Sequence, residues 1–150
     1  MNNLELKQKL VDECRKQQQK IIDNLKSVMS EAQQSANEYG APRDRYDSYR
    51  MQLLRKKDMY AQQMEKAMTE ILALEKIDVN TEMNKVGFGS VVITKEQKIF
   101  ISIGVGKLIV ENENYLAISL MVPLAQAIVG KQKGDVAEFN GKKIEILEVY

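Results

Sequence analysis

The chain has 150 residues, of which 22 are Lys or Arg and 21 are Asp or Glu, with no histidine and a single cysteine, Cys14. A net charge this close to zero does not indicate a nucleic-acid partner, so only local basic patches are candidates for binding one. The absence of histidine excludes Ser-His-Asp and Cys-His catalysis and metal sites built on imidazole. A lone cysteine, interpreted as a core residue, fits a reducing cytoplasm.

Charged residues interrupt any signal peptide, and the longest uncharged stretch, residues 114–130, is too short and too polar for a membrane span. We therefore expect a cytoplasmic protein with no membrane partner.

Composition divides the chain into two parts. Seven of the eight glycines lie at or after Gly87, whereas residues 1–79 contain only Gly40 and Pro42 as helix breakers. Gln, Lys, Glu, Met and Ala dominate the first part, and Val, Ile, Phe and Gly dominate the second. We expect two domains, residues 1–79 and 80–150.

The first domain carries a heptad pattern that predicts a long helix over residues 3–39. Asn2 and Glu5 have the spacing of a capping box at its start, and Gly40 is suited to end it. Apolar residues and a few polar ones recur at 3,4 spacing, which is typical of a coiled-coil seam. The seam positions are Leu4, Lys7, Val11, Cys14, Gln18, Ile21, Leu25, Val28, Ala32, Ser35 and Tyr39.

A second helix is expected over residues 43–76, because Pro42 is well placed in its first turn and a second seam follows. The connection between the two helices is short, which favours an antiparallel hairpin within one chain over two chains side by side. A coiled-coil spacer or a dimerisation rod remains the alternative. The second seam slips by one residue near Leu53 and comprises Tyr46, Tyr49, Leu53, Lys57, Tyr60, Met64, Ala67, Ile71 and Leu74.

The second domain is predicted to be β-rich, with one short helix over residues 123–129. Asn140-Gly141 between two strand-like runs predicts a tight hairpin, since both turn positions need a positive φ. Phe88, Phe100, Tyr115 and Phe139 are candidates for its core. The fold class is therefore α+β, a long antiparallel two-helix coiled coil followed by a small β-rich domain. The strands are expected at residues 86–94, 98–103, 107–110, 115–120, 135–139 and 142–149.

The segment Ile118–Lys131, read as ISLMVPLAQAIVGK, resembles the Ile-Ser…Ser-Pro-Ile-Ala-x-x-Leu-Ile-Gly-Lys segment of the Gre family of transcription factors, which includes GreA and GreB. Gly134–Val136, Ile144–Tyr150 and Ile77–Val79 continue the similarity. Val122 replaces the family's Ser before Pro, which removes a candidate N-cap for the short helix. The resemblance implies an FKBP-like C-terminal domain and a helical hairpin that enters the secondary channel of RNA polymerase.

The predicted hairpin tip is where the resemblance places chemistry. The family's tip reads Gly-Asp-Leu-Arg-Glu-Asn, and its two carboxylates help to hold a Mg²⁺ ion that activates water for RNA cleavage. In this chain Ala41 replaces the first acid, and Asp44 with Asp47 three residues later is the only nearby pair of carboxylates. These two are the candidate catalytic residues. Their alternative interpretation is as acidic residues that favour the first turn of a helix.

Basic residues surround and follow this tip. They are candidates to face RNA or the polymerase, and the alternative is a solvated helix face. Arginines beside the carboxylates would also compete with a metal ion for them, which disfavours efficient cleavage. The candidate residues are Arg43, Arg45, Arg50, Arg55, Lys56 and Lys57.

The resemblance therefore implies a monomeric Gre-like factor that binds RNA polymerase and modulates elongation without efficient transcript cleavage. It would not be an enzyme in its own right, and it would hold no metal of its own, with Mg²⁺ present only in the polymerase complex. The 3′ end of the nascent RNA is a further candidate partner. Two alternatives remain open: a cleavage factor that donates Asp44 and Asp47, and an FKBP-like chaperone or prolyl isomerase.

Overall fold

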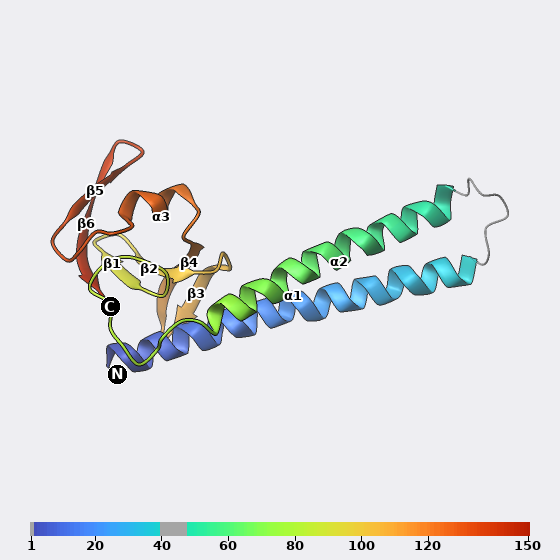
Figure 1. The fold of residues 1–150 in the computed structure, drawn as a ribbon, viewed down its shortest axis with the longest axis horizontal. Coiled ribbons are helices and arrows are strands. Elements are labelled where there is room, and N and C mark those ends of the chain that lie inside the picture. The colour runs from blue at the N-terminus through green and yellow to red at the C-terminus, as the bar shows by residue number, and fades with distance from the viewer. Residues whose placement is uncertain (1, 40–47) are drawn as a thin grey trace. The chain divides into compact units, whose positions relative to one another are not determined.

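The computed structural model describes residues 2–39 and 48–150 and has the predicted α+β class, with a helical hairpin, a six-stranded sheet and one short helix (Figure 1). By packing, the chain divides into two compact units, residues 18–71 and a second unit made of residues 1–17 and 72–150. Within the described residues no helix combines the length and the apolar character that crossing a membrane requires. The elements are α1 (Asn3–Tyr39), α2 (Ser48–Leu74), β1 (Val91–Thr94), β2 (Lys98–Ser102), β3 (Gly106–Val110), β4 (Glu113–Ser119), α3 (Pro123–Ile128), β5 (Val136–Phe139) and β6 (Lys142–Val149).

The predicted start of α1 is confirmed. The backbone N–H of Glu5 donates to Asn2 Oδ1 at 2.8 Å, which satisfies one of the unpaired amides of the first turn. The Asn2 side-chain amide lies 3.4 Å from Glu5 Oε1. The end of α1 and the start of α2 cannot be compared with the Gly40 and Pro42 predictions, because residues 40–47 lie outside the described part of the chain.

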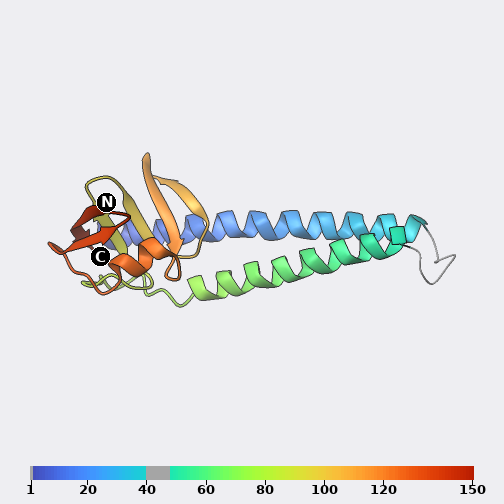
Figure 2. The same ribbon diagram turned by 90° about the horizontal axis from the view of Figure 1, so that it is seen from above.

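In residues 18–71 the two helices run antiparallel as a pair, as Figures 1 and 2 show. The prediction that Ile21 lies in the seam is wrong: Ile21 is 44% exposed, and its neighbour Ile22 is 2% exposed. A straight α-helix drifts by about 20° per heptad relative to a strict 3.5-residue repeat, so a seam extrapolated from Leu4 slips by one position along the helix. The buried side therefore continues from Gln18 through Ile22 to Ala36.

On α2 the predicted seam holds from Leu53 onward. Ala67 and Leu74 are buried, and Leu53, Lys57, Tyr60, Met64 and Ile71 are half-buried. Tyr49, predicted to lie in the seam, is instead 51% exposed. It lies in the first turn of α2.

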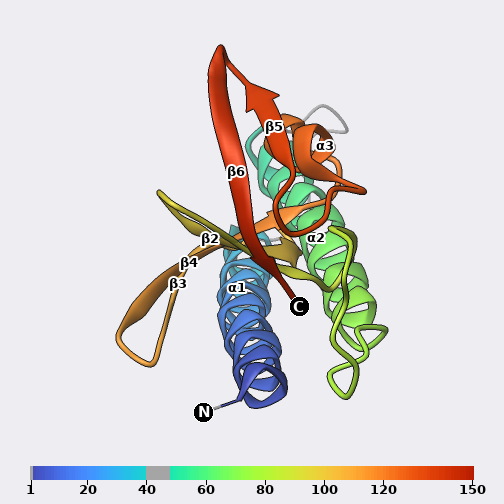
Figure 3. The same ribbon diagram turned by 90° about the vertical axis from the view of Figure 1, so that its left-hand side faces the viewer.

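The six strands form one sheet with the order β3-β4-β2-β1-β6-β5. All neighbours are antiparallel except β2 and β4, which pair in parallel with Phe100 opposite Ala117. Figure 3 shows the twist of the sheet, with β6 crossing steeply over β2 to β4. The strands at its two edges are β3 and β5.

The sheet is covered on both faces within its own unit. Successive residues of a strand point to opposite faces, so Val91 and Val92 of β1 enter different cores. One core joins Val91, Phe100 and Tyr115 with Leu10, Val11 and Cys14 of α1. The other core joins Val92, Ile99 and Ile101 with Ala125 and Ile128 of α3. The first turns of α1 therefore pack on the sheet, and the predicted seam serves two different partners along its length.

The hairpin predicted at Asn140-Gly141 is present, with φ values of 52° and 75° and Phe139 opposite Lys142. The first strand is shorter than predicted, because residues 87–90 form a turn in which Ser90 Oγ donates to the Gly87 carbonyl at 2.7 Å. Gly89 adopts φ 91° there, and its position against Ile77 leaves little room for a side chain. β1 therefore begins at Val91.

The packing places residues 1–17 with the sheet, whereas the sequence predicts a domain boundary between residues 79 and 80. Lys7 illustrates the association: it is 1% exposed, and its Nζ donates to the Thr81 carbonyl at 3.2 Å. Burial lowers the pKa of Lys7, and the carboxylates of Asp78 and Glu82 oppose that shift. Two separable domains at residues 1–79 and 80–150 remain a prediction.

Candidate functional site

The proposed catalytic carboxylates are Asp44 and Asp47. Both lie outside the described residues, as do Arg43, Arg45 and Ala41. Their roles therefore stay predictions from the sequence. Among the described residues there is no group of three or more side chains able to hold a metal ion.

Arg50 is the first predicted basic residue that the structure describes, and it is half-buried. Its Nη1 donates to the backbone carbonyl of Ala36 at 3.0 Å, across the helix pair. Ala36 itself is fully buried. This contact joins the last turns of α1 to the first turn of α2, so Arg50 has a structural role in addition to its charge.

Lys57 lies seven residues after Arg50 and therefore on the same face of α2. Its Nζ donates to Gln33 Oε1 of α1 at 2.5 Å. Arg55 and Lys56, in contrast, are exposed and make no ion pair within the described residues. The predicted basic stripe is thus two features: Arg50 and Lys57 bind α1, and Arg55 with Lys56 faces solvent.

A third contact fixes the register of the pair nearer the other end. Gln18 is 3% exposed, and its Nε2 donates to the Ala67 carbonyl at 3.2 Å and to Glu70 Oε2 at 2.7 Å. Residue numbers fall along α2 as they rise along α1, since Gln18 meets Ala67, Gln33 meets Lys57 and Ala36 meets Arg50. A polar residue at a seam position specifies register because a slipped alignment would leave it buried without a partner.

The second part of the candidate site is the end of β4 with α3, residues 118–130. The absent cap is confirmed: Val122 is the N-cap residue of α3, and no side chain bonds to the first turn there. Two contacts hold the turn in its place. Ser119 Oγ accepts from the Met121 amide at 3.1 Å, and Gln126 Nε2 donates to the Leu120 carbonyl at 2.6 Å. Met121 is 81% exposed, which makes it the most exposed large apolar residue described.

Comparison with known proteins gives structural relatives only. No protein-family model matches the chain, and a search of curated proteins found no match. The crystal structure of GreA factor homolog 1 (Gfh1) of Thermus thermophilus is 15% identical, with a TM-score of 0.35 and coverage of 91% of this chain and 94% of that chain. That of Thermus aquaticus Gfh1 is 18% identical, with a TM-score of 0.33 and coverage of 90% and 92%. The chain is similar to solved GreA-like factors.

The seam predicted from the sequence includes Lys57 but not Arg50, and it identifies neither Gln33 nor Ala36 as a partner. A signal was present, because the seven-residue spacing from Arg50 to Lys57 matches the heptad and assigns both to the α1-facing side. Sequence reasoning also missed Met121 as an exposed apolar residue. No periodic pattern identifies a single exposed side chain in a turn, so the sequence carried no signal for it.

Proposed function

We propose that this chain is a Gre-like transcription factor that binds RNA polymerase, with the hairpin entering the secondary channel and the sheet unit docking at its rim. The observation that carries the proposal is the antiparallel α1–α2 hairpin of fixed register, followed in the chain by an α+β unit that bears the Ile118–Lys131 segment. The helices satisfy their seam within one chain, which favours a monomer. The site of action is the cytoplasm.

In this proposal the factor modulates elongation without efficient transcript cleavage. Two converging carboxylates are needed to hold Mg²⁺ well, and the tip offers Asp44 and Asp47 with Ala41 in place of the family's first acid. Arg43 and Arg45 compete with the metal for the same oxygens. The protein supplies no metal and no complete active site. At most it acts as a trans-acting cofactor beside the RNA 3′ end.

The exposed pair Arg55 and Lys56 supports a polar contact with the polymerase or its RNA. Neither residue is used by the hairpin, so their charge is available to a partner of negative potential. Met121, in the turn before α3, offers an exposed apolar side chain for docking at the rim.

The test is co-purification of RNA polymerase with the protein, competed by GreA. A variant that lacks residues 40–50 is expected to lose its effect on transcription and to keep part of its docking. Absence of any polymerase binding by the wild type would remove the proposed function.

The cleavage alternative is tested with backtracked complexes, by measuring release of short 3′ RNA fragments. We expect no rapid release by the wild type. Rapid release that Asp44→Asn and Asp47→Asn each abolish, with little further loss in the double variant, would establish the cleavage factor instead.

A further inference from the structure

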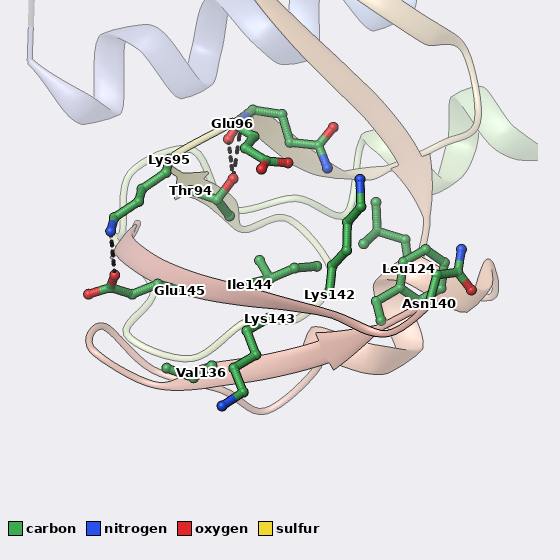
Figure 4. Close-up of a pocket in the computed structure, with 12 residues that line it drawn as sticks. Thr94, Lys95, Glu96, Leu124, Val136, Asn140, Lys142, Lys143, Ile144 and Glu145 are labelled. Atoms are coloured by element: carbon green, nitrogen blue, oxygen red, sulfur yellow. Dashed lines mark hydrogen bonds and ion pairs between the residues drawn. The ribbon is translucent and has the colours of Figure 1, made fainter.

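The sheet unit contains a groove that the proposed function does not use. It lies between the β1–β2 turn at residues 94–97, Leu124 of α3 and the β5–β6 hairpin, and it has a volume of 540 Å³ (Figure 4). All its walls belong to residues 72–150. A volume of this size is typical of binding pockets.

The floor of the groove is apolar and continues a buried core outward. Ala137 lies opposite Ile144 and Phe139 lies opposite Lys142, so all four share one face of the β5–β6 pair. Ala137 on this face is 3% exposed and packs in the core that includes α3. Farther along the hairpin, Phe139 and Ile144 are only half-buried, and with Leu124 they line the groove.

The rim of the groove is polar and unevenly paired. Lys95 Nζ lies 3.3 Å from Glu145 Oε2, and this ion pair closes one end. Lys142 extends from β6 toward the β1–β2 turn, as Figure 4 shows, and has no acidic partner within the described residues. Gln97 and Asn140 also line the groove, and a side-chain amide can both donate and accept.

These groups together fit a segment of protein better than a nucleic acid. An apolar floor takes a large aliphatic side chain, side-chain amides match the polar groups of a peptide backbone, and an ammonium group above the floor takes a neighbouring carboxylate. A phosphate backbone would need a more basic wall, because the lysines of the lining, Lys95, Lys142 and Lys143, are interspersed with Glu96 and Glu145, and Lys95 is paired with Glu145. Stacked bases would need more rings, because Phe139 is the single aromatic side chain in the described lining.

We propose that this groove binds an extended acidic peptide segment of a partner protein, with a large aliphatic side chain on Leu124, Phe139 and Ile144 and an adjacent carboxylate on Lys142. Binding forms no covalent bond. The proposal is independent of the proposed function, because it concerns the free protein and needs no polymerase.

The experiment is a titration of the ¹⁵N-labelled full chain with the capped peptide acetyl-Gly-Ser-Glu-Leu-Glu-Ser-Gly-amide, followed by amide chemical shifts. Shifts are expected in residues 94–97 and 139–145. Replacement of both peptide glutamates by lysine, or of the leucine by serine, is expected to weaken binding by about tenfold or more. These probes leave the protein unchanged, so folding does not affect the comparison.

Lys142→Glu is the matching change in the protein, and it is expected to weaken the acidic peptide by about tenfold. Lys133→Glu is the control, because Lys133 is exposed and lies outside the groove. Equal binding of the glutamate and lysine peptides, or no shift at the groove, would overturn the proposal. Stronger shifts of the same amides with hexauridylate would overturn it in favour of RNA.

Discussion

Gln18 Nε2 donates to Glu70 Oε2 at 2.7 Å, joining α1 to α2 through a side chain that is 3% exposed. The same nitrogen lies 3.2 Å from the Ala67 carbonyl, so one amide serves two acceptors of the facing helix. A buried polar group in a seam stabilises less than a leucine would, but it penalises every register that removes its partners.

Gln18→Ala should therefore lower the free energy of unfolding by about 1–3 kcal/mol, because the acceptors lose their donor and the seam loses a buried side chain. Gln18→Leu should be closer to the wild type in stability while relaxing the register. Urea melts of the full chain measure the first effect. Gln19→Ala is the control, since Gln19 is exposed and its side chain bonds to Asp23 of its own helix. A loss no larger than the control's would show that the Gln18 contacts contribute nothing.

Ile22 and Ile21 provide a matched pair for the position of the seam. Ile22→Ala should cost about 2–4 kcal/mol, because it leaves a cavity between the helices. Ile21→Ala should cost less than about 1 kcal/mol, since Ile21 is 44% exposed. Denaturant unfolding of both variants decides the matter. A larger loss of stability for Ile21→Ala than for Ile22→Ala would show that the strict heptad seam is correct.

Lys7 predicts a dependence of stability on pH. Burial lowers the pKa of Lys7 below the usual 10.5. Its charge therefore lowers the free energy of unfolding at every pH at which Lys7 is protonated in both the folded and the unfolded chain. As pH rises through the lowered pKa, the folded state releases its proton before the unfolded state does, and stability rises up to pH 10.5. Lys7→Met removes this dependence, along with the hydrogen bond to Thr81.

The measurement is the difference in unfolding free energy between Lys7→Met and the wild type, from urea melts at several pH values. The variant should be neutral or more stable at neutral pH. Its advantage should shrink as the pH approaches 10.5. An advantage that grows with pH would contradict the assigned cause. Lys9→Met is the control, because Lys9 is exposed and forms an ion pair with Glu111.

Cys14 should be unreactive in the folded chain. Burial raises the pKa of its thiol to about 11, and its Sγ lies 3.7 Å from Ser102 Oγ. The thiolate is the reactive species, so both its small population and its burial slow attack. Because the chain has one cysteine, labelling with a maleimide at neutral pH reports on Cys14 alone. Labelling of the native protein at the rate of the urea-unfolded chain would contradict the packing of α1 on the sheet.

The sequence predicted the elements that depend on local chemistry. Asn2 and Glu5 have the three-residue spacing of a capping box, which starts a helix. Asn140 and Gly141 supply the two positive φ values that their turn needs. The prediction for Ile21 was wrong because a strict heptad spacing does not include the slow rotation of the buried side around a straight helix. Cys14 is buried, as the sequence predicts, but its sheet partner could not be predicted, since no pattern in residues 1–17 distinguishes a helix partner from a sheet partner. The groove at Lys142 joins three segments that are far apart in the chain, and its existence depends on tertiary packing alone.

The last prediction distinguishes the exposed basic residues of α2, which are candidates to bind a partner, from Arg50, which holds α2 to α1. Arg55 and Lys56 are exposed, so Arg55→Glu with Lys56→Glu should leave the unfolding free energy within about 0.5 kcal/mol of the wild type. If these residues face the polymerase or its RNA, the double variant should bind the polymerase more weakly, and the loss should diminish at high salt. Arg50→Ala should instead lower the free energy of unfolding by about 1 kcal/mol, because it removes the hydrogen bond to the Ala36 carbonyl. The two readouts are urea melts and competition binding to RNA polymerase at low and high salt. Unchanged binding of the stable double variant would remove Arg55 and Lys56 from the interface and leave the rest of the proposed function standing.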